Sequence, residues 1–129
     1  MSAPRAAGCH CGSGGDYAAC CGPLHSGVPA ADAVSLMRSR YCAYVLDLRH
    51  YLLATWDPDT RPDALEAPQA GLKWLGLLVK SSRVHGADAA EVAFEARYRI
   101  GGGKAVKMKE TSRFRRRDGA WYYVDGVHG

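Results

Sequence analysis

The fold is decided by residues 91–126, which read EVAFEARYRIGGGKAVKMKETSRFRRRDGAWYYVDG. From Val92 to Ile100, larger apolar residues alternate with charged or small ones, which is the period of a half-buried strand. The same period returns from Val106, after the turn signal Gly101-Gly102-Gly103, and again after Asp118-Gly119. The stretch therefore predicts three consecutive antiparallel strands.

The residues before these strands predict two helices and one further strand. Asp32 is an N-cap candidate for a first helix, and Asp47 is expected to cap a second one that stops before Asp57-Pro58. The first helix carries apolar residues at helical spacing: Val34, Met37, Tyr41, Tyr44, Val45 and Leu48. The second helix carries Tyr51, Leu52 and Trp56. Trp74 to Val79 is an apolar run typical of a strand. Helices followed by an antiparallel meander predict an α+β fold.

Residues 1–28 differ from the rest, because they are rich in Gly, Ser, Cys and Pro and lack a sustained period. Four of the five cysteines fall here, in the order C-x-C, eight residues, C-C. They are Cys9, Cys11, Cys20 and Cys21. A closed set of four thiolates is the structural form of a zinc site, so we expect one Zn²⁺ per chain. Such a site contributes about 10 to 16 kcal/mol of apparent binding energy to folding.

Other uses of these residues are open at this point. His10 and His25 are substitute ligands, ranked below Cys21 because four cysteines already complete the set. A disulfide framework is less expected, because the cysteines cluster and the N-terminus lacks the apolar region of a signal peptide. Cys42 stands alone within the first helical pattern and is expected to be a small buried apolar residue.

Residues 9–22, CHCGSGGDYAACCG, resemble the SEC-C motif of the bacterial preprotein-translocase motor and of several unrelated bacterial proteins. The resemblance implies the ligand set Cys9, Cys11, Cys20 and Cys21. It also implies a docking surface for a protein partner. Many proteins that resemble this chain carry a second such motif at the C-terminus. This sequence reaches Gly129 without one, which puts in doubt a role that needs two zinc elements.

The rest of the chain resembles the YchJ-like bacterial proteins. The resemblance rests on LMRSRYCAY (36–44), YLLATW (51–56), WLGL (74–77), SRF (112–114) and GAWYYVDG (119–126). It implies an NTF2-like (cystatin-like) domain, a strongly curved antiparallel sheet closed by helices. We therefore expect a SEC-C zinc lobe over residues 1–28 and an NTF2-like domain over residues 29–129.

Glu110 is the most informative polar residue outside the cysteine cluster. It shares the strand parity of Met108 and Phe114, so it is expected to face the core, where it needs a partner such as Arg38 or Arg40. An NTF2-like cone often holds a ligand, so we also consider a pocket there. Its candidate residues are Arg38, Tyr41, Tyr44, Trp74, Glu110, Trp121 and Tyr123.

The preferred function is a zinc-binding adaptor of the cytoplasm, without a transmembrane segment. One alternative is a small-molecule-binding protein or an enzyme that uses the cone, with Glu110, Asp125 or His50 as acid–base groups. Catalysis is the less expected of these, because no catalytic motif occurs. A second alternative is nucleic-acid binding through a basic sheet face, although a net charge of only +4 does not favour it. That face would use Arg97, Arg99, Lys104, Lys107, Lys109, Arg113, Arg115, Arg116 and Arg117. A homodimer is also an expectation from the resemblance.

Overall fold

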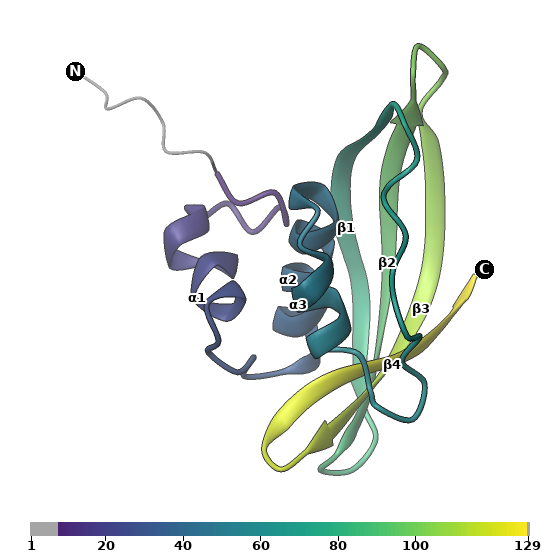
Figure 1. Ribbon diagram of the computed structural model, residues 1–129. Helices are drawn as coiled ribbons and strands as arrows, with labels where there is room; N and C mark the ends of the chain where they lie inside the picture. The colour runs from purple at the N-terminus through teal and green to yellow at the C-terminus, as the bar shows by residue number, and fades with distance from the viewer. Residues whose placement is uncertain (1–7, 129) are drawn as a thin grey trace.

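The computed structural model describes residues 8–128, which form three layers: a small N-terminal lobe, a helical layer and a curved sheet (Figure 1). The lobe holds the 3-10 helix η1 (Tyr17–Ala19) and helix α1 (Cys21–His25). The helical layer holds α2 (Ala33–Leu46) and α3 (Arg49–Ala54). The sheet is built from β1 (Leu72–Val84), β2 (Ala89–Ile100), β3 (Val106–Arg117) and β4 (Ala120–His128). Within this described part, no helix has the length and apolar run that a membrane span needs.

The sheet is the predicted antiparallel meander, with strand order β1-β2-β3-β4. Val92 pairs with Ser112 and Phe94 pairs with Glu110, so the alternation seen in the sequence sets the register between β2 and β3. Register shifts in β1 and at Arg113/Phe114 in β3 bend the strands. The resulting curved sheet, with the helices on one face, confirms the α+β prediction and has the architecture expected of an NTF2-like domain.

Helix α2 begins where the sequence predicts and ends in a different way. The Asp32 Oδ1 atom accepts a hydrogen bond from the Ser35 backbone N–H (2.7 Å), which confirms the N-cap. Asp47 does not cap the second helix, so that prediction is wrong. It takes a left-handed conformation (φ 56°) that terminates α2, and Leu48 stands at the N-cap of α3. Trp56 lies beyond α3 and forms a parallel bridge with Tyr123 of β4.

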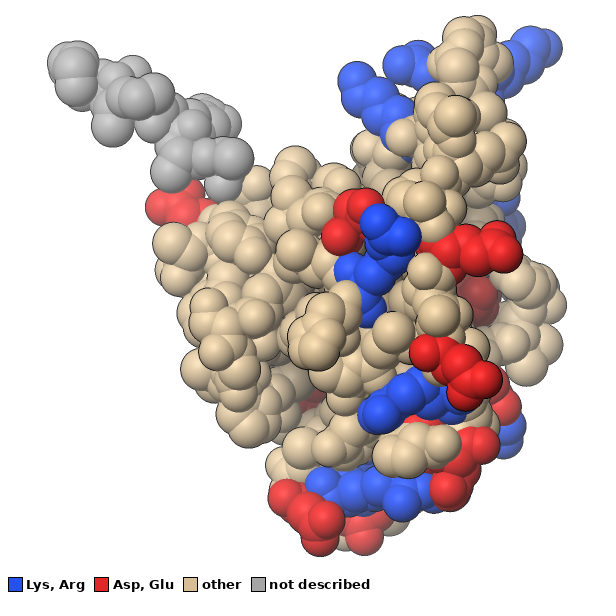
Figure 2. Space-filling view, viewed as in Figure 1, with Lys and Arg blue, Asp and Glu red and all other residues tan. Residues whose placement is uncertain are grey.

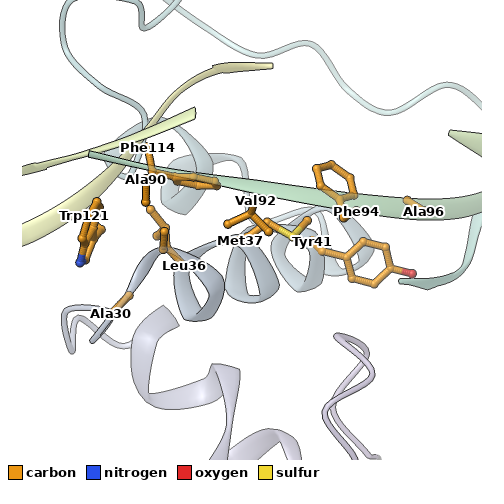
Figure 3. Packing of buried hydrophobic residues seen from close by; sticks show 11 residues of the cluster. Ala30, Leu36, Met37, Tyr41, Ala90, Val92, Phe94, Ala96, Phe114 and Trp121 are labelled. Carbon is orange, nitrogen blue, oxygen red and sulfur yellow. The ribbon is translucent and has the colours of Figure 1, made fainter. Parts of the chain in front are cut away.

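The main core lies between α2 and the concave face of the sheet. Figure 3 shows Met37 and Tyr41 of α2 directed toward Val92 and Phe94 of β2. The buried residues of this cluster are Ala30, Ala33, Leu36, Met37, Tyr41, Ala90, Val92, Phe94, Ala96, Phe114 and Trp121. Cys42 of α2 points toward the lobe, where it forms a second buried cluster with the lobe cysteines. Helix α2 is therefore packed on both sides.

Candidate functional site

The structure brings four cysteine thiols together in the lobe. The Sγ atoms of Cys9, Cys11, Cys20 and Cys21 all lie within 4.8 Å of one another. The Sγ atoms of Cys11 and Cys20 are 3.5 Å apart, and those of Cys20 and Cys21 are 3.9 Å apart. Four sulfurs at about 2.3 Å from a tetrahedral zinc ion would lie about 3.8 Å from one another. The donor set and these separations therefore fit one metal ion.

Tight backbone turns make this clustering possible. The Cys9 N–H donates to the Gly15 carbonyl (2.8 Å) and closes the loop that carries Cys9 and Cys11. Gly12 in this loop has φ +80°, and a Cβ there would lie 3.2 Å from the Leu77 carbonyl oxygen. A Cβ on Gly22 would lie only 2.8 Å from the Tyr17 carbonyl oxygen, so a glycine is needed where η1 meets α1. These glycines let the two cysteine pairs face each other.

The thiols shift one another's acidity strongly. The Cys21 thiol donates to Cys11 and lowers the pKa of Cys11 to about 4. The same contact, with burial and the thiol of Cys42, raises the pKa of Cys21. Burial raises the pKa of Cys9 to about 12. These buried sulfurs share protons, and a metal cation that binds the sulfurs displaces those protons.

Helix α2 contacts the cysteine cluster directly. Cys42 is fully buried, as expected, but its Sγ atom also lies 3.9 Å from that of Cys9. Its contact with the Cys21 thiol lowers the pKa of Cys42 to about 7. Arg38 Nη1 donates to the Cys11 carbonyl (2.7 Å). The cluster thus contacts the larger domain through α2, and its Gly12 loop also lies close to Leu77 of β1.

His25, a candidate substitute ligand, has another role. Its Nε2 atom lies 2.8 Å from the Ser39 carbonyl, which can only accept, so Nε2 carries the proton. Nδ1 then accepts from the Tyr17 hydroxyl (2.6 Å). Both ring nitrogens are engaged, Nδ1 within the lobe and Nε2 between the lobe and α2. His10 is exposed, and the thiol set forms without either histidine.

A second feature is a cavity of about 280 Å³ between α2 and the sheet. Its walls are Met37, Arg40, Tyr41, Tyr44, Trp74, Phe94, Ala96, Met108, Glu110, Ser112, Phe114 and Tyr123. The predicted pocket residues Tyr41, Tyr44, Trp74, Glu110 and Tyr123 are among them. Two other predicted residues lie elsewhere. Arg38 faces the lobe, because two positions along a helix turn a side chain by about 200°. Trp121 packs in the core beside Arg116.

Glu110 faces the interior as its strand parity predicts, but its partners differ from those expected. Its Oε2 atom accepts a hydrogen bond from the Ser112 hydroxyl (2.8 Å), and His128 Nε2 lies 3.8 Å from Oε1. Neither Arg38 nor Arg40 forms an ion pair with it among residues 8–128. Burial and then the Glu110 charge raise the pKa of Tyr123 to about 12. The Tyr123 hydroxyl is therefore a protonated donor at neutral pH. Asp125 and His50, the other acid–base candidates, lie outside this cavity.

Several of the basic residues proposed for nucleic-acid binding are engaged in ion pairs. Arg113 pairs with Asp125, and Arg116 pairs with Asp88 at 3.2 Å. Arg117 donates to Asp57, whose side chain is 1% exposed. Figure 2 shows Lys and Arg side chains interspersed with Asp and Glu over the lower part of the molecule. This part of the surface carries mixed charge.

Comparison with known proteins gives the family. Residues 32–126 match the family described as "YchJ, middle NTF2-like domain". A UPF0225 protein of Xanthomonas campestris pv. campestris (strain 8004) is 56% identical over 118 residues, which cover 91% of this chain and 92% of the relative. The chain belongs to the YchJ-like family, UPF0225.

Two further proteins that are similar to this YchJ-like chain support the same family assignment. A UPF0225 protein of Bordetella pertussis is 51% identical over 123 residues, 93% of this chain and 92% of the relative. A solution structure from Rhodopseudomonas palustris, described as a SEC-C motif containing protein, is similar with a TM-score of 0.83 and 40% identity. The match covers 92% of this chain and 96% of that one. The predicted resemblance to the YchJ-like family is confirmed.

Proposed function

We propose that this YchJ-like chain is a zinc-binding protein in which one structural ion organises the lobe and fixes it to α2. The observation that carries the proposal is the set of four thiols within 4.8 Å of one another. Tetrahedral sulfur sites are typical of zinc or of iron–sulfur clusters. A closed set of four protein ligands leaves no position for water or substrate, so the ion is structural.

The lobe needs such an ion because it has little else to bury. Among residues 8–128, its buried cluster consists of Cys9, Cys11 and Cys21 together with Cys42 from α2, with Tyr17 and Cys20 packed against it as partly buried residues. Thiol contacts of this size supply little apolar area. An ion bound by four thiolates would contribute far more, and it would depend on reducing conditions.

Metal analysis of the protein purified under reducing conditions tests this proposal. We expect about one zinc per chain, lost when Cys20 and Cys21 are both changed to Ser. The matched control is Cys42→Ala, which removes the fifth buried thiol and should keep the zinc. Iron in place of zinc, or a fully metal-free chain, would contradict the proposal. Loss of zinc in Cys42→Ala would assign Cys42 to the ligand set.

We further propose that the exposed side of the lobe contacts a protein partner. Support comes from residues 12–16, which are all exposed and which lie on the loop between the two cysteine pairs. An ion that holds this loop in one conformation would reduce the ordering cost of association. Capture from a native lysate should then recover a partner with intact protein and lose it with the Cys20→Ser, Cys21→Ser variant. Equal recovery by both proteins would place the contact outside the lobe.

A further inference from the structure

Arg40 is a buried charge whose hydrogen-bonding capacity is only partly used. It is 5% exposed and forms part of the cavity wall. Its Nη1 atom donates to the Leu52 carbonyl and to the Thr55 hydroxyl, both at 2.7 Å. The Tyr44 hydroxyl, which also lines the cavity, is a further hydrogen-bonding neighbour of the guanidinium, and no carboxylate among residues 8–128 pairs with it. Burial lowers the pKa of Arg40, but a guanidinium still stays protonated at neutral pH.

The environment of Arg40 compensates this charge incompletely. The guanidinium carbon lies 4.5 Å from the ring centre of Tyr123 and 5.2 Å from that of Trp56, so cation–π contacts supply part of the compensation. Arg113 and Arg117 are more exposed, yet each pairs with a carboxylate. For Arg40 no such pair occurs in the described part of the chain. A buried cation without an acidic partner favours an anion beside it.

The geometry of Arg40 matches a carboxylate in particular. A guanidinium is a planar fork whose adjacent N–H groups can bind the two oxygens of one carboxylate. The two Nη1 bonds fix the orientation of the group, so a ligand would meet a preformed site. Tyr123, whose hydroxyl is protonated, also lines the cavity near Arg40.

The remaining walls favour an apolar body. Tyr41, Trp74 and Phe94 contribute aromatic faces, and Met37 and Met108 contribute flexible thioethers. The volume of about 280 Å³ is just below the range of typical ligand cavities, which begins at about 300 Å³. The occupant must therefore be small.

Glu110 limits the charge of the occupant. Its carboxylate lines the same cavity and already accepts a hydrogen bond from Ser112. A second negative group on the ligand would meet this carboxylate in an apolar surrounding, where like charges repel strongly. One carboxylate is accommodated and two are disfavoured.

The geometry points to a binding site for a small monocarboxylic acid with an aromatic or aliphatic body, whose carboxylate is received by Arg40. The five features that carry it are the burial of Arg40, its lack of an acidic partner among the described residues, the apolar walls, the cavity size and the position of Glu110. This site is separate from the cysteine cluster and does not rest on the zinc proposal.

Three probes with the same phenyl group test the site on the whole chain of 129 residues: 3-phenylpropionate, phenylsuccinate and 3-phenylpropylamine. Titration followed by amide NMR should show that 3-phenylpropionate binds and shifts the signals of residues around the cavity. The dicarboxylate and the amine should bind at least about tenfold more weakly. Tighter binding of the amine would identify Glu110 as the recognition group and overturn the proposal.

Two variants and one NMR signal of the unmodified protein then test whether Arg40 binds the carboxylate. Arg40→Met should weaken 3-phenylpropionate binding by about tenfold or more, whereas Glu110→Gln should leave it equal or tighter. Because Arg40 also bonds Leu52 and Thr55, its variant could fold poorly. The Arg40 Nε–H signal of the unmodified protein avoids this difficulty, since a bound carboxylate should shift it. Binding without that shift, or no binding of the monocarboxylate at millimolar concentration, would overturn the proposal.

Discussion

The lobe and the larger domain are stabilised by different means, although both pack on the same helix. On one side of α2 the buried side chains are the thiols of Cys9, Cys11 and Cys21 against Cys42. On the other side, Leu36 and Met37 enter a cluster of eleven buried apolar residues. The first set depends on what the sulfurs bind, and the second depends on apolar area removed from water. The two regions should therefore respond to different perturbations.

Metal removal should separate the two regions most clearly. Chelation of the proposed zinc from reduced protein takes away about 10 to 16 kcal/mol of apparent binding energy. We expect the backbone amides of residues 8–28 to lose hydrogen-exchange protection, while those of β2 and β3 keep it. The core of the larger domain contains no ligand of this ion, so its cooperative unfolding should persist.

Re-addition of zinc after chelation is the control and should restore protection in the lobe. Loss of protection throughout the sheet on chelation would show that the lobe and the larger domain fold as one unit.

Shortening a buried side chain in the apolar core should destabilise the larger domain and leave the metal site of the lobe intact. Leu36 is 1% exposed on α2, so Leu36→Ala should lower the free energy of unfolding by about 2 to 5 kcal/mol. The zinc content should stay near that of the unmodified protein. Leu75→Ala on β1, where the side chain is 36% exposed, is the matched control and should cost about 0.5 kcal/mol or less. Urea denaturation followed by fluorescence measures the free energy of unfolding of both variants.

The ion pair between the buried Asp57 and Arg117 should make the free energy of unfolding depend on pH. Burial raises the pKa of Asp57, but the Asp59 backbone N–H and Arg117 outweigh burial and hold it below its ordinary value of 3.8. A carboxyl with a lowered folded-state pKa stabilises the protein above its unfolded-state pKa and loses this contribution as the pH falls through the folded-state value. Asp57→Asn should therefore cost about 2 to 3 kcal/mol at neutral pH.

The pH profile of Asp57→Asn is the sharper measurement. Below about pH 4 the unmodified protein should lose stability and approach the variant, because both then lack the charge on residue 57. A constant difference between the two proteins from pH 7 to pH 2 would show that Asp57 acts through packing alone.

Local patterns explain which parts of the structure were predictable. The period-2 alternation around Val92 and the turn at Gly101-Gly102-Gly103 act between neighbours in the chain, so they predicted the meander. The clustering of cysteines in a glycine-rich segment predicted that the thiols would meet. In each case the signal and the structure lie within a few residues of each other.

The missed features depend on distant contacts. Arg40 lies on the cavity face of α2 with Met37, Tyr41 and Tyr44, but the sequence suggested it only as a partner of Glu110, because its charge removed it from the apolar pattern that defined this face. Asp57 was read as the end of a helix, although Arg117, sixty residues later, makes it a buried anchor. Asp47 looked like an N-cap because the sequence does not reveal that the chain turns there in a left-handed conformation.

The smallest predicted effect concerns the element that both regions share. Asp32 caps α2 by accepting from the Ser35 N–H, so Asp32→Ala should cost about 1 kcal/mol. The matched control is Asp16→Ala, because Asp16 stands at the N-cap of η1 without a side-chain capping bond among the described residues. Since α2 presents Cys42 to one layer and Leu36 to the other, the loss should appear both in zinc affinity and in the unfolding of the sheet. A shift in only one of these two measurements would show that α2 does not couple the lobe to the larger domain.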